Sequence, residues 1–534
     1  MGRLKPLLAG ILLSGALGLG AVAANAAQIP LDSATIADFN AAFKAGTLTS
    51  EQLVQLYLKR IEAYDEQGPK INTVITLNSK ALEQARALDA ERKSKGPRSP
   101  LHGIPVLLKD NFDTADMPTT GGSVLLENWV PPDDAFLVKK LRDAGAIILA
   151  KVNLSEFASG GAHSSLGGQT LNPHDLTRTP SGSSGGTGSA IAAVFAPLGY
   201  GTDTGGSIRG PSTSNGIVGL KPTHGLLSRD GIIPLALTFD TGGPMTRSVY
   251  DIAVSLNHTV GVDKADAATQ KSAGKFEKDY TKFLKKDALK GARVGIARDF
   301  LGADEDVDWV IESALSAMRA AGATVVDVRY PKWLLDAKTE FYGAIRYPEF
   351  ASQIGDYLAT TGPQYPKNIG ELIDRADSYR SLRPDGAGPN PRRWNLMKRE
   401  KATPGLNDYN YLAVRDQGLP LVRAALMGII TSNKLDAIVY PTSPRRPAQI
   451  AAPASNVPET VPSATNFANL SGFPDLIVPA GFTSDDLPVG ISFFGPAFSE
   501  AKLLALGYSF EQATKAIRVP VHTPLLPGDV IEVP

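Results

Sequence analysis

Apolar residues recur at helical spacing between residues 49 and 95, and this pattern predicts two amphipathic helices. Thr49 to Gln52 has the composition of a capping box, and the apolar face that follows it consists of Leu53, Leu56, Tyr57 and Ile61. A second helix is expected over Ser79 to Lys95, which is rich in Ala, Glu and Arg. Both helices are expected to belong to an N-terminal helical arm, residues 28–100.

Further along the chain, short apolar strands alternate with helices. Ile104 to Lys109 is a strand candidate. Asp133 and Asp134 are expected to cap a helix that Gly145 ends, and Ala146 to Ala150 follows as a buried strand. Such alternation predicts an α/β fold with helices packed over a mostly buried sheet.

The same order of helix, glycine and strand returns over Ile311 to Val328. Two more short apolar strands are expected over Leu435 to Tyr440 and Pro474 to Pro479. Residues 263–290 are charged and weakly periodic, which indicates a surface connector. Residues 331–420 hold many aromatic residues and few strand signals, so we expect a variable helical cap there.

The amino-acid composition argues against several kinds of function. The chain has 534 residues with 54 basic and 54 acidic side chains, so its charge balance does not indicate a nucleic-acid partner. It contains no cysteine, which excludes thiolate nucleophiles, thiolate metal ligands and disulfides. Its six histidines show no metal-ligand spacing, so no metal site is expected.

The N-terminus has the layout of a secretory signal peptide, residues 1–27. Arg3 and Lys5 precede an uncharged apolar run from Leu7 to Ala24, and Ala24 to Ala26 supplies small residues for cleavage. We expect a periplasmic or secreted protein with no stable membrane association after cleavage. The alternative is an uncleaved membrane anchor, because the apolar run is long enough to span a bilayer.

Glycine and serine are concentrated in a segment suited to acyl transfer, which needs a nucleophile, a base and donors for an oxyanion. In Thr204-Gly205-Gly206-Ser207 the glycines let backbone N–H groups approach a substrate oxygen, since no Cβ blocks them. A serine at the end of this loop is placed to attack the same carbonyl. Ser207 is therefore the candidate nucleophile, with Thr204, Gly205 and Gly206 as candidate oxyanion residues.

Lysine acts as a base only when its pKa is strongly lowered. The ordinary value of about 10.4 must fall by roughly 3 units before half of the side chain is neutral at pH 7. Burial has this effect, and Lys109 directly follows the apolar stretch Ile104 to Leu108. Lys109 is thus a candidate base.

Three blocks in this order resemble the signature of the amidase signature family of serine hydrolases. They are Leu101 to Asn111, Ser181 to Gly188 and Gly201 to Arg209, and Gly216 to Thr223 follows them. The resemblance implies an α/β/α sandwich around a large mixed β-sheet, with residues 101–534 as the amidase signature domain. A departure is that Ser181 stands where the family often has glycine.

The resemblance also implies residue roles. Ser207 is the nucleophile, Ser183 is a bridging serine held by a cis peptide bond, and Lys109 is the base. No cofactor is implied. Asp203 and Arg209 are expected to pair beneath the nucleophile loop as support.

A further residue is carried over from the family with less sequence support. Phe157 falls where related enzymes place a residue against the scissile group, so it is a candidate substrate-binding residue.

The same residues allow other assignments. Gly182 to Gly186 matches the G-x-S-x-G nucleophile elbow with Ser184 as nucleophile, but that motif needs a strand before it, and a loop is expected here. Without the resemblance, Ser207 with His224 is the obvious pair; we expect His224 and His102 to be structural. The glycine-rich blocks lack the Gly-Lys-Ser/Thr of a phosphate-binding loop.

The predicted function is amide-bond hydrolysis through an acyl-enzyme, acting on a small-molecule or peptide amide. Secreted bacterial amidases, including those that remove the amide of peptide C-termini, are the most similar members. Aryl amides, carbamates and oligoamides stay open as substrates. The glutaminase subunit of tRNA amidotransferases shares the core but needs a partner. The alternatives of another class are a non-catalytic amide-binding protein and a partner-dependent subunit.

Overall fold

The computed structural model describes residues 1–2, 27–382, 390–450 and 461–534. The predicted signal peptide lies almost wholly outside these residues. In the described ranges no helix combines the length and apolar character needed to cross a membrane.

A mixed sheet of eleven strands forms the centre of the protein and confirms the predicted fold class. In spatial order its strands are β11 (Thr324–Val328), β10 (Arg293–Ala297), β12 (Ala437–Pro441), β14 (Pro488–Phe494), β13 (Asp475–Phe482), β8 (Val218–Lys221), β9 (Thr241–Thr246), β7 (Leu198–Asp203), β3 (Pro105–Lys109), β4 (Ile147–Val152) and β2 (Val74–Leu77).

Strand direction changes along this sheet. β11, β10 and β12 run parallel at one side, and β7, β3 and β4 run parallel at the other. The pairs β12–β14, β14–β13, β13–β8, β8–β9, β9–β7 and β4–β2 are antiparallel. Most of these strands are buried along their whole length, as expected for a sheet covered on both faces.

Helices cover the sheet and form one flank of the molecule. Their bounds are α1 (Ile36–Ala45), α2 (Ser50–Ile61), α3 (Ala81–Lys95), α4 (Phe136–Asp143), α5 (Gly185–Ala192), α6 (Arg209–Ser214), α7 (Val249–Thr259), α8 (Glu305–Ala320), α9 (Lys332–Ala359), α10 (Ile369–Leu382), α11 (Pro391–Lys401), α12 (Tyr409–Ala413), α13 (Leu419–Ser432), α14 (Asn466–Ser471) and α15 (Glu500–Thr514).

The N-terminal segment is tied to the rest of the protein by strands as well as helices. β1 (Ala27–Pro30) pairs with β15 (Val530–Val533) near the C-terminus, in a separate two-stranded sheet. β2 joins the edge of the central sheet by pairing with β4. A second small sheet pairs β5 (His163–Ser164) with β6 (Gly168–Gln169).

Most predicted elements agree with the structure to within a few residues. Thr49 is the N-cap of α2, and its side chain and that of Gln52 form the predicted reciprocal capping box. The strands predicted at residues 104–109, 146–150, 435–440 and 474–479 correspond to β3, β4, β12 and β13. The helix and strand predicted over 311–328 are α8 and β11, and Gly322 between them adopts a φ of 94°.

The predicted cap of α4 is wrong. Its N-cap is Ala135, which makes no side-chain capping bond. The Asp134 carboxylate instead accepts a hydrogen bond from the Ala115 N–H at 2.9 Å and pairs with Arg142 at 2.9 Å. The Asp134 carboxylate therefore binds Arg142 and the Ala115 N–H instead of the N–H groups at the start of α4.

The segment 263–290 is less exposed than a simple surface connector. It contains two short 3₁₀ turns, Ala267–Ser272 and Tyr280–Phe283, and no longer element. Tyr280 and Leu289 are buried in the main core. Charged residues at half of the other positions made these two buried apolar residues difficult to recognise in the sequence.

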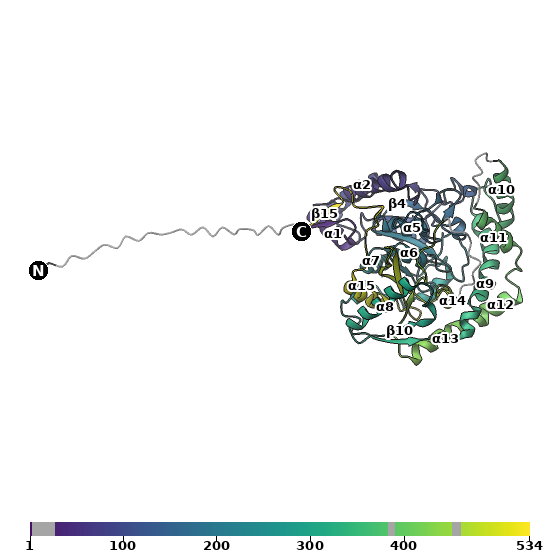
Figure 1. Ribbon diagram of the computed structural model, residues 1–534. Coiled ribbons are helices and arrows are strands. Elements are labelled where there is room, and N and C mark those ends of the chain that lie inside the picture. Colours follow the sequence, from purple (N-terminus) through teal and green to yellow (C-terminus); the bar gives the residue numbers. More distant parts are fainter. Residues whose placement is uncertain (3–26, 383–389, 451–460) are drawn as a thin grey trace.

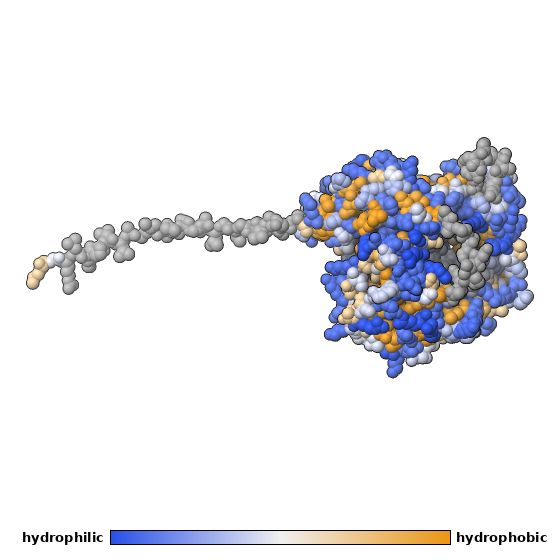
Figure 2. Space-filling model, in the orientation of Figure 1, coloured by the Kyte–Doolittle hydropathy of each residue, from blue (hydrophilic) through white to orange (hydrophobic). Residues whose placement is uncertain are grey.

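The described part of residues 331–420 is helical, as predicted. Figure 1 shows α9 to α13 along one flank of the molecule, with α1 and α2 at the opposite side of the view. The face seen in Figure 2 is largely hydrophilic with scattered apolar patches. The cap shares an apolar cluster with the body of the protein, in which Phe350, Ile354 and Trp394 of the cap pack with Phe157 and Ile233.

Candidate active site

Two neighbouring parallel strands bring the candidate base and the candidate nucleophile loop together. Lys109 is the last residue of β3, and Asp203 is the last residue of β7. The two strands pair in parallel, with Leu108 opposite Tyr200. Because parallel strands end at the same edge of a sheet, the loop that carries Ser207 begins beside Lys109.

Lys109 is fully buried and firmly held. Its Nζ donates to Ser183 Oγ at 2.7 Å and to Thr202 Oγ1 at 2.6 Å. Burial lowers the pKa of Lys109 to about 7, against the opposing effect of the Asp203 and Asp240 carboxylates. A large fraction of Lys109 is therefore neutral at neutral pH, which is the state a base requires.

Ser183 stands at a turn between a loop and α5. The peptide bond from Gly182 to Ser183 is cis, as the family resemblance implies. The Ser183 carbonyl accepts a hydrogen bond from the Ser155 N–H at 3.0 Å. The Ser183 hydroxyl faces Lys109, from which it accepts the 2.7 Å hydrogen bond.

Ser183 and Ser207 line one cavity of about 190 Å³. Its described lining is small and uncharged and consists of Ser155, Ala158, Ser159, Gly160, Gly161, Gly182, Ser183, Gly205, Ser207, Leu235 and Tyr342. The structure thus brings the two predicted serines to the same space, with Lys109 behind Ser183.

The nucleophile loop rests on a buried ion pair. The Asp203 carboxylate accepts hydrogen bonds from the N–H groups of Gly206, at 2.9 Å, and Ile208, at 3.0 Å. It also pairs with Arg209 at 3.1 Å, and this guanidinium holds the pKa of Asp203 well below its usual range. Arg209 in turn contacts Asp475 at 3.2 Å. The predicted supporting pair of Asp203 and Arg209 is present.

The oxyanion prediction needs one correction. The Gly206 N–H is already bound to Asp203, so it is not free to bind a substrate oxygen. Within the described residues the N–H groups of Thr204, Gly205 and Ser207 have no hydrogen-bond acceptor. Of these three residues, Gly205 and Ser207 line the cavity.

A close contact from the cap explains why residue 205 is glycine. A Cβ added there would lie 2.6 Å from the Tyr342 hydroxyl of α9. The Tyr342 ring stacks on Phe239 with ring centres 5.5 Å apart, which restricts its movement. Tyr342 therefore forms the wall of the cavity opposite the nucleophile loop.

Phe157 does not line this cavity. Its ring is buried in the apolar core shared with the cap, beside Phe350 and Ile233. The backbone at Phe157 is unusual, with φ 47° and ψ 42°, and the next residue, Ala158, reaches the cavity in its place.

Sequence reasoning missed two groups that surround Lys109. Thr202 accepts hydrogen bonds from Lys109 and, at 3.1 Å, from Asn111 Nδ2. The Asp240 carboxylate accepts a hydrogen bond from the Thr204 hydroxyl at 2.5 Å, and its negative charge raises the pKa of Lys109. Thr202 lies one residue before Asp203 on β7, inside the signature block Gly201 to Arg209, so it could have been found there. No motif in the sequence includes Asp240.

The alternative nucleophile and base are engaged elsewhere. The Ser184 hydroxyl donates to the Thr202 carbonyl at 3.1 Å and is fully buried. The His224 ring lies 2.9 Å from the Leu237 carbonyl, and burial lowers its pKa to about 3. His102 likewise contacts the Leu88 carbonyl at 2.8 Å. All three side chains have structural roles.

Metal binding needs several ligand side chains that lie close together. Among the described residues, no group of three or more His, Asp or Glu side chains is placed to hold a metal ion. The chemistry available at this site is that of Lys109, the two serines and backbone N–H groups.

Comparisons with known proteins identify the family of this chain. Residues 52–504 match the family model described as Amidase. The peptide amidase from Stenotrophomonas maltophilia is 39% identical, with a TM-score of 0.85 over 91% of this chain and 98% of that one. An amidase family protein from Bacillus anthracis is 33% identical, with a TM-score of 0.81 over 92% of each chain.

Curated relatives give a second line of comparison. A glutamyl-tRNA(Gln) amidotransferase subunit from Thermoanaerobacter pseudethanolicus is 37% identical over 494 residues, which are 91% of this chain and 97% of the relative. The corresponding protein from Halorhodospira halophila is 35% identical over 488 residues. From its matched length, its sheet and its relatives, the chain belongs to the amidase signature family and is an amide-bond hydrolase.

Proposed function

We propose that this protein hydrolyses the terminal carboxamide of peptides, with Ser207 as nucleophile, Ser183 as proton relay and Lys109 as base. The observation that carries the proposal is the 2.7 Å hydrogen bond from a fully buried Lys109 to Ser183, at the wall of the cavity that Ser207 shares. A hydroxyl between a base and a nucleophile is suited to pass a proton in both directions.

The proposed reaction has two steps. Ser207 Oγ attacks the amide carbon while its proton passes to Ser183 Oγ, and the Ser183 proton passes to neutral Lys109. The N–H groups of Gly205 and Ser207 hold the oxyanion. Collapse of the intermediate breaks the C–N bond, and the proton returns through Ser183 to the leaving amine. Water then attacks the acyl-enzyme and regenerates Ser207 by the same relay.

The lining of the cavity favours a neutral carboxamide with ammonia as the leaving group. Among its described residues none is charged, and glycine, serine and alanine make up most of it. Free glutamine carries an ammonium and a carboxylate near its amide, and both would lose hydration there without a countercharge. A peptide amide has neither charge close to the scissile bond.

Ammonia release from a panel of C-terminal peptide amides tests the proposal. Free glutamine, aryl amides and carbamates complete the panel, and Ser207→Ala is the control protein. Release from peptide amides by the wild type alone supports the proposal. Release from glutamine alone favours the activity suggested by the amidotransferase relatives. Turnover confined to aryl amides or carbamates contradicts the proposed substrate class but not the assignment of Ser207 as nucleophile.

We also propose export by the N-terminal segment. A positively charged start, an uncharged apolar run from Leu7 to Ala24 and small residues at Ala24 to Ala26 support it. Expression of the full chain in a bacterial host followed by fractionation and mass measurement tests it. A protein that begins near residue 27 or 28 outside the cytoplasm is expected; an intact N-terminus in the cytoplasmic fraction contradicts export.

A further inference from the structure

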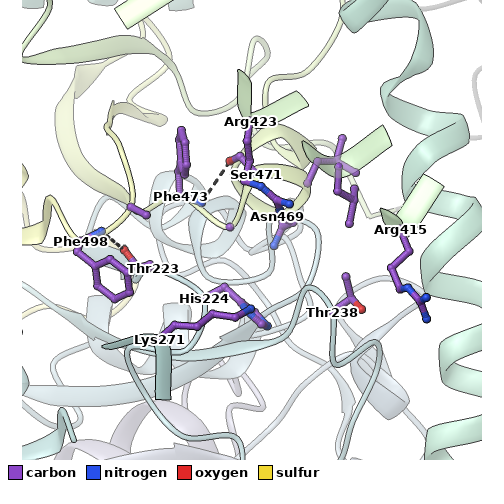
Figure 3. A pocket seen from close by; sticks show the side chains of 14 residues that line it. Thr223, His224, Thr238, Lys271, Arg415, Arg423, Asn469, Ser471, Phe473 and Phe498 are labelled. Atoms are coloured by element: carbon purple, nitrogen blue, oxygen red, sulfur yellow. Dashed lines mark hydrogen bonds between the residues drawn. The ribbon is translucent and has the colours of Figure 1, made fainter. Parts of the chain in front are cut away.

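A second cavity of about 500 Å³ lies beside α13, the helix that follows the cap, and the two serines do not line it. It shares no lining residue with the cavity of Ser183 and Ser207. Figure 3 shows Lys271, Arg415 and Arg423 reaching it from different sides. Lys271 comes from the turn Ala267–Ser272, Arg415 from a π-helical turn after α12, and Arg423 from α13.

Two of these cations form no ion pair. Arg415 pairs with the Asp416 carboxylate at 2.7 Å. In the part of the chain that the structure describes, Lys271 and Arg423 form no ion pair, and no acidic side chain lines the cavity. Partial burial lowers the pKa of both side chains; the charges of Arg423 and Arg229 lower that of Lys271 further, and the Asp266 carboxylate opposes this effect. Their mutual repulsion is relieved by an anion placed between them.

The remaining wall is apolar or neutral. Phe473 and Phe498 contribute aromatic rings, and Leu419 comes from α13. His224 is neutral, because burial and the nearby Arg229 lower its pKa to about 3. The cavity therefore offers unpaired positive charge beside an apolar surface.

We propose that this cavity is a binding site for a small organic anion, in which a phosphate or carboxylate group contacts Lys271 and Arg423 and an apolar body packs against Phe473 and Phe498. The site is distinct from the amide-hydrolysis site and does not depend on the proposed substrate. Asn469 of α14 separates the two regions: it lines this cavity and donates to Asp203 beneath the nucleophile loop at 2.8 Å.

Calorimetric titration of the full chain with phenyl phosphate tests the proposal. One site per chain is expected, with weaker binding of inorganic phosphate, which lacks the apolar body. Lys271→Gln combined with Arg423→Gln is expected to weaken binding about tenfold or more, since two charge contacts are lost. Arg423→Lys keeps the charge and is expected to keep most of the affinity, which guards against a loss caused by misfolding.

A matched control uses another cavity of about 510 Å³, which Lys282, Lys285 and Lys502 line and which shares Phe498 with the proposed site. Two of its lysines are paired, Lys282 with Asp279 at 3.6 Å and Lys502 with Asp436 at 3.0 Å. Lys282→Gln with Lys502→Gln is therefore expected to leave phenyl phosphate binding unchanged. Absence of saturable binding at millimolar concentration, or equal binding by wild type and the Lys271 and Arg423 double variant, would overturn the proposal.

Discussion

The ammonium of Lys109 and the hydroxyl of Ser183 lie 2.7 Å apart, although 74 residues separate them in the chain. The contact exists because β3 ends beside β7 and the loop before α5 crosses the same edge of the sheet. Burial of Lys109 then makes its proton easy to lose. The fold therefore supplies both the position and the basicity of the proposed base.

The rate should follow the charge of Lys109. Its pKa of about 7 predicts that kcat/KM rises with pH up to about 7 and is level above, because only neutral Lys109 accepts the proton. Lys109→Arg, which stays charged, should lower kcat/KM by roughly 100-fold or more at every pH. Initial rates between pH 5 and pH 9 measure both effects. An unchanged profile in Lys109→Arg would argue against the base assignment.

The pH dependence of kcat/KM should also depend on the charge of Asp240. Its carboxylate favours protonated Lys109, so Asp240→Asn is expected to move the acid limb of kcat/KM to lower pH. The amide retains an oxygen for the N–H groups of Leu235 and Ala236, which donate to Asp240 at 2.8 Å and 2.9 Å. A pH profile of this variant is the measurement, and a shift to higher pH contradicts the electrostatic account.

Contact between the nucleophile loop and the cap should appear in a double variant. Gly205→Ala places a methyl group 2.6 Å from the Tyr342 hydroxyl, so we expect a loss of activity of about 100-fold from displacement of the oxyanion donors. Tyr342→Ala removes the hydroxyl and also the ring carbons Cζ and Cε2, which the methyl group would meet at 2.8 Å and 3.1 Å, and should restore part of the rate in the Gly205→Ala background. Strictly multiplicative effects in kcat/KM would show that the two residues act independently.

The buried pair under the loop should contribute to stability. Asp203→Asn leaves Arg209 with one acidic partner in a fully buried position, and we expect a loss of about 3 kcal/mol in the free energy of unfolding. Urea unfolding measures it. Asp486→Asn breaks an exposed pair with Arg518 and should change stability by less than about 1 kcal/mol. Equal effects in the two variants would contradict the role given to burial.

Local patterns carried most of what could be predicted. Apolar runs before turn residues located β3, β4, β12 and β13, and local composition singled out Ser207 and Lys109, whereas Ser183 followed from the family resemblance. The mixed sheet followed from the family resemblance rather than from periodicity.

Contacts between distant segments explain what was missed. Tyr342 and Asp240 meet the site from the cap and from the loop before β9, and no local pattern marks either position. The unusual backbone at Phe157 places its ring in the apolar core and Ala158 in the lining of the cavity, and no local pattern in the sequence indicates this. Asp134 does not cap α4, because its carboxylate pairs with Arg142.

Covalent labelling tests the central claim most directly. A fluorophosphonate reacts with an activated serine hydroxyl, and peptide mass spectrometry locates the adduct. We expect labelling at Ser207, none in Ser207→Ala, and strongly slowed labelling in Lys109→Met. An adduct on Ser183 or Ser184 in the wild-type protein, or undiminished labelling of Ser207→Ala, would contradict the assignment of Ser207 as nucleophile.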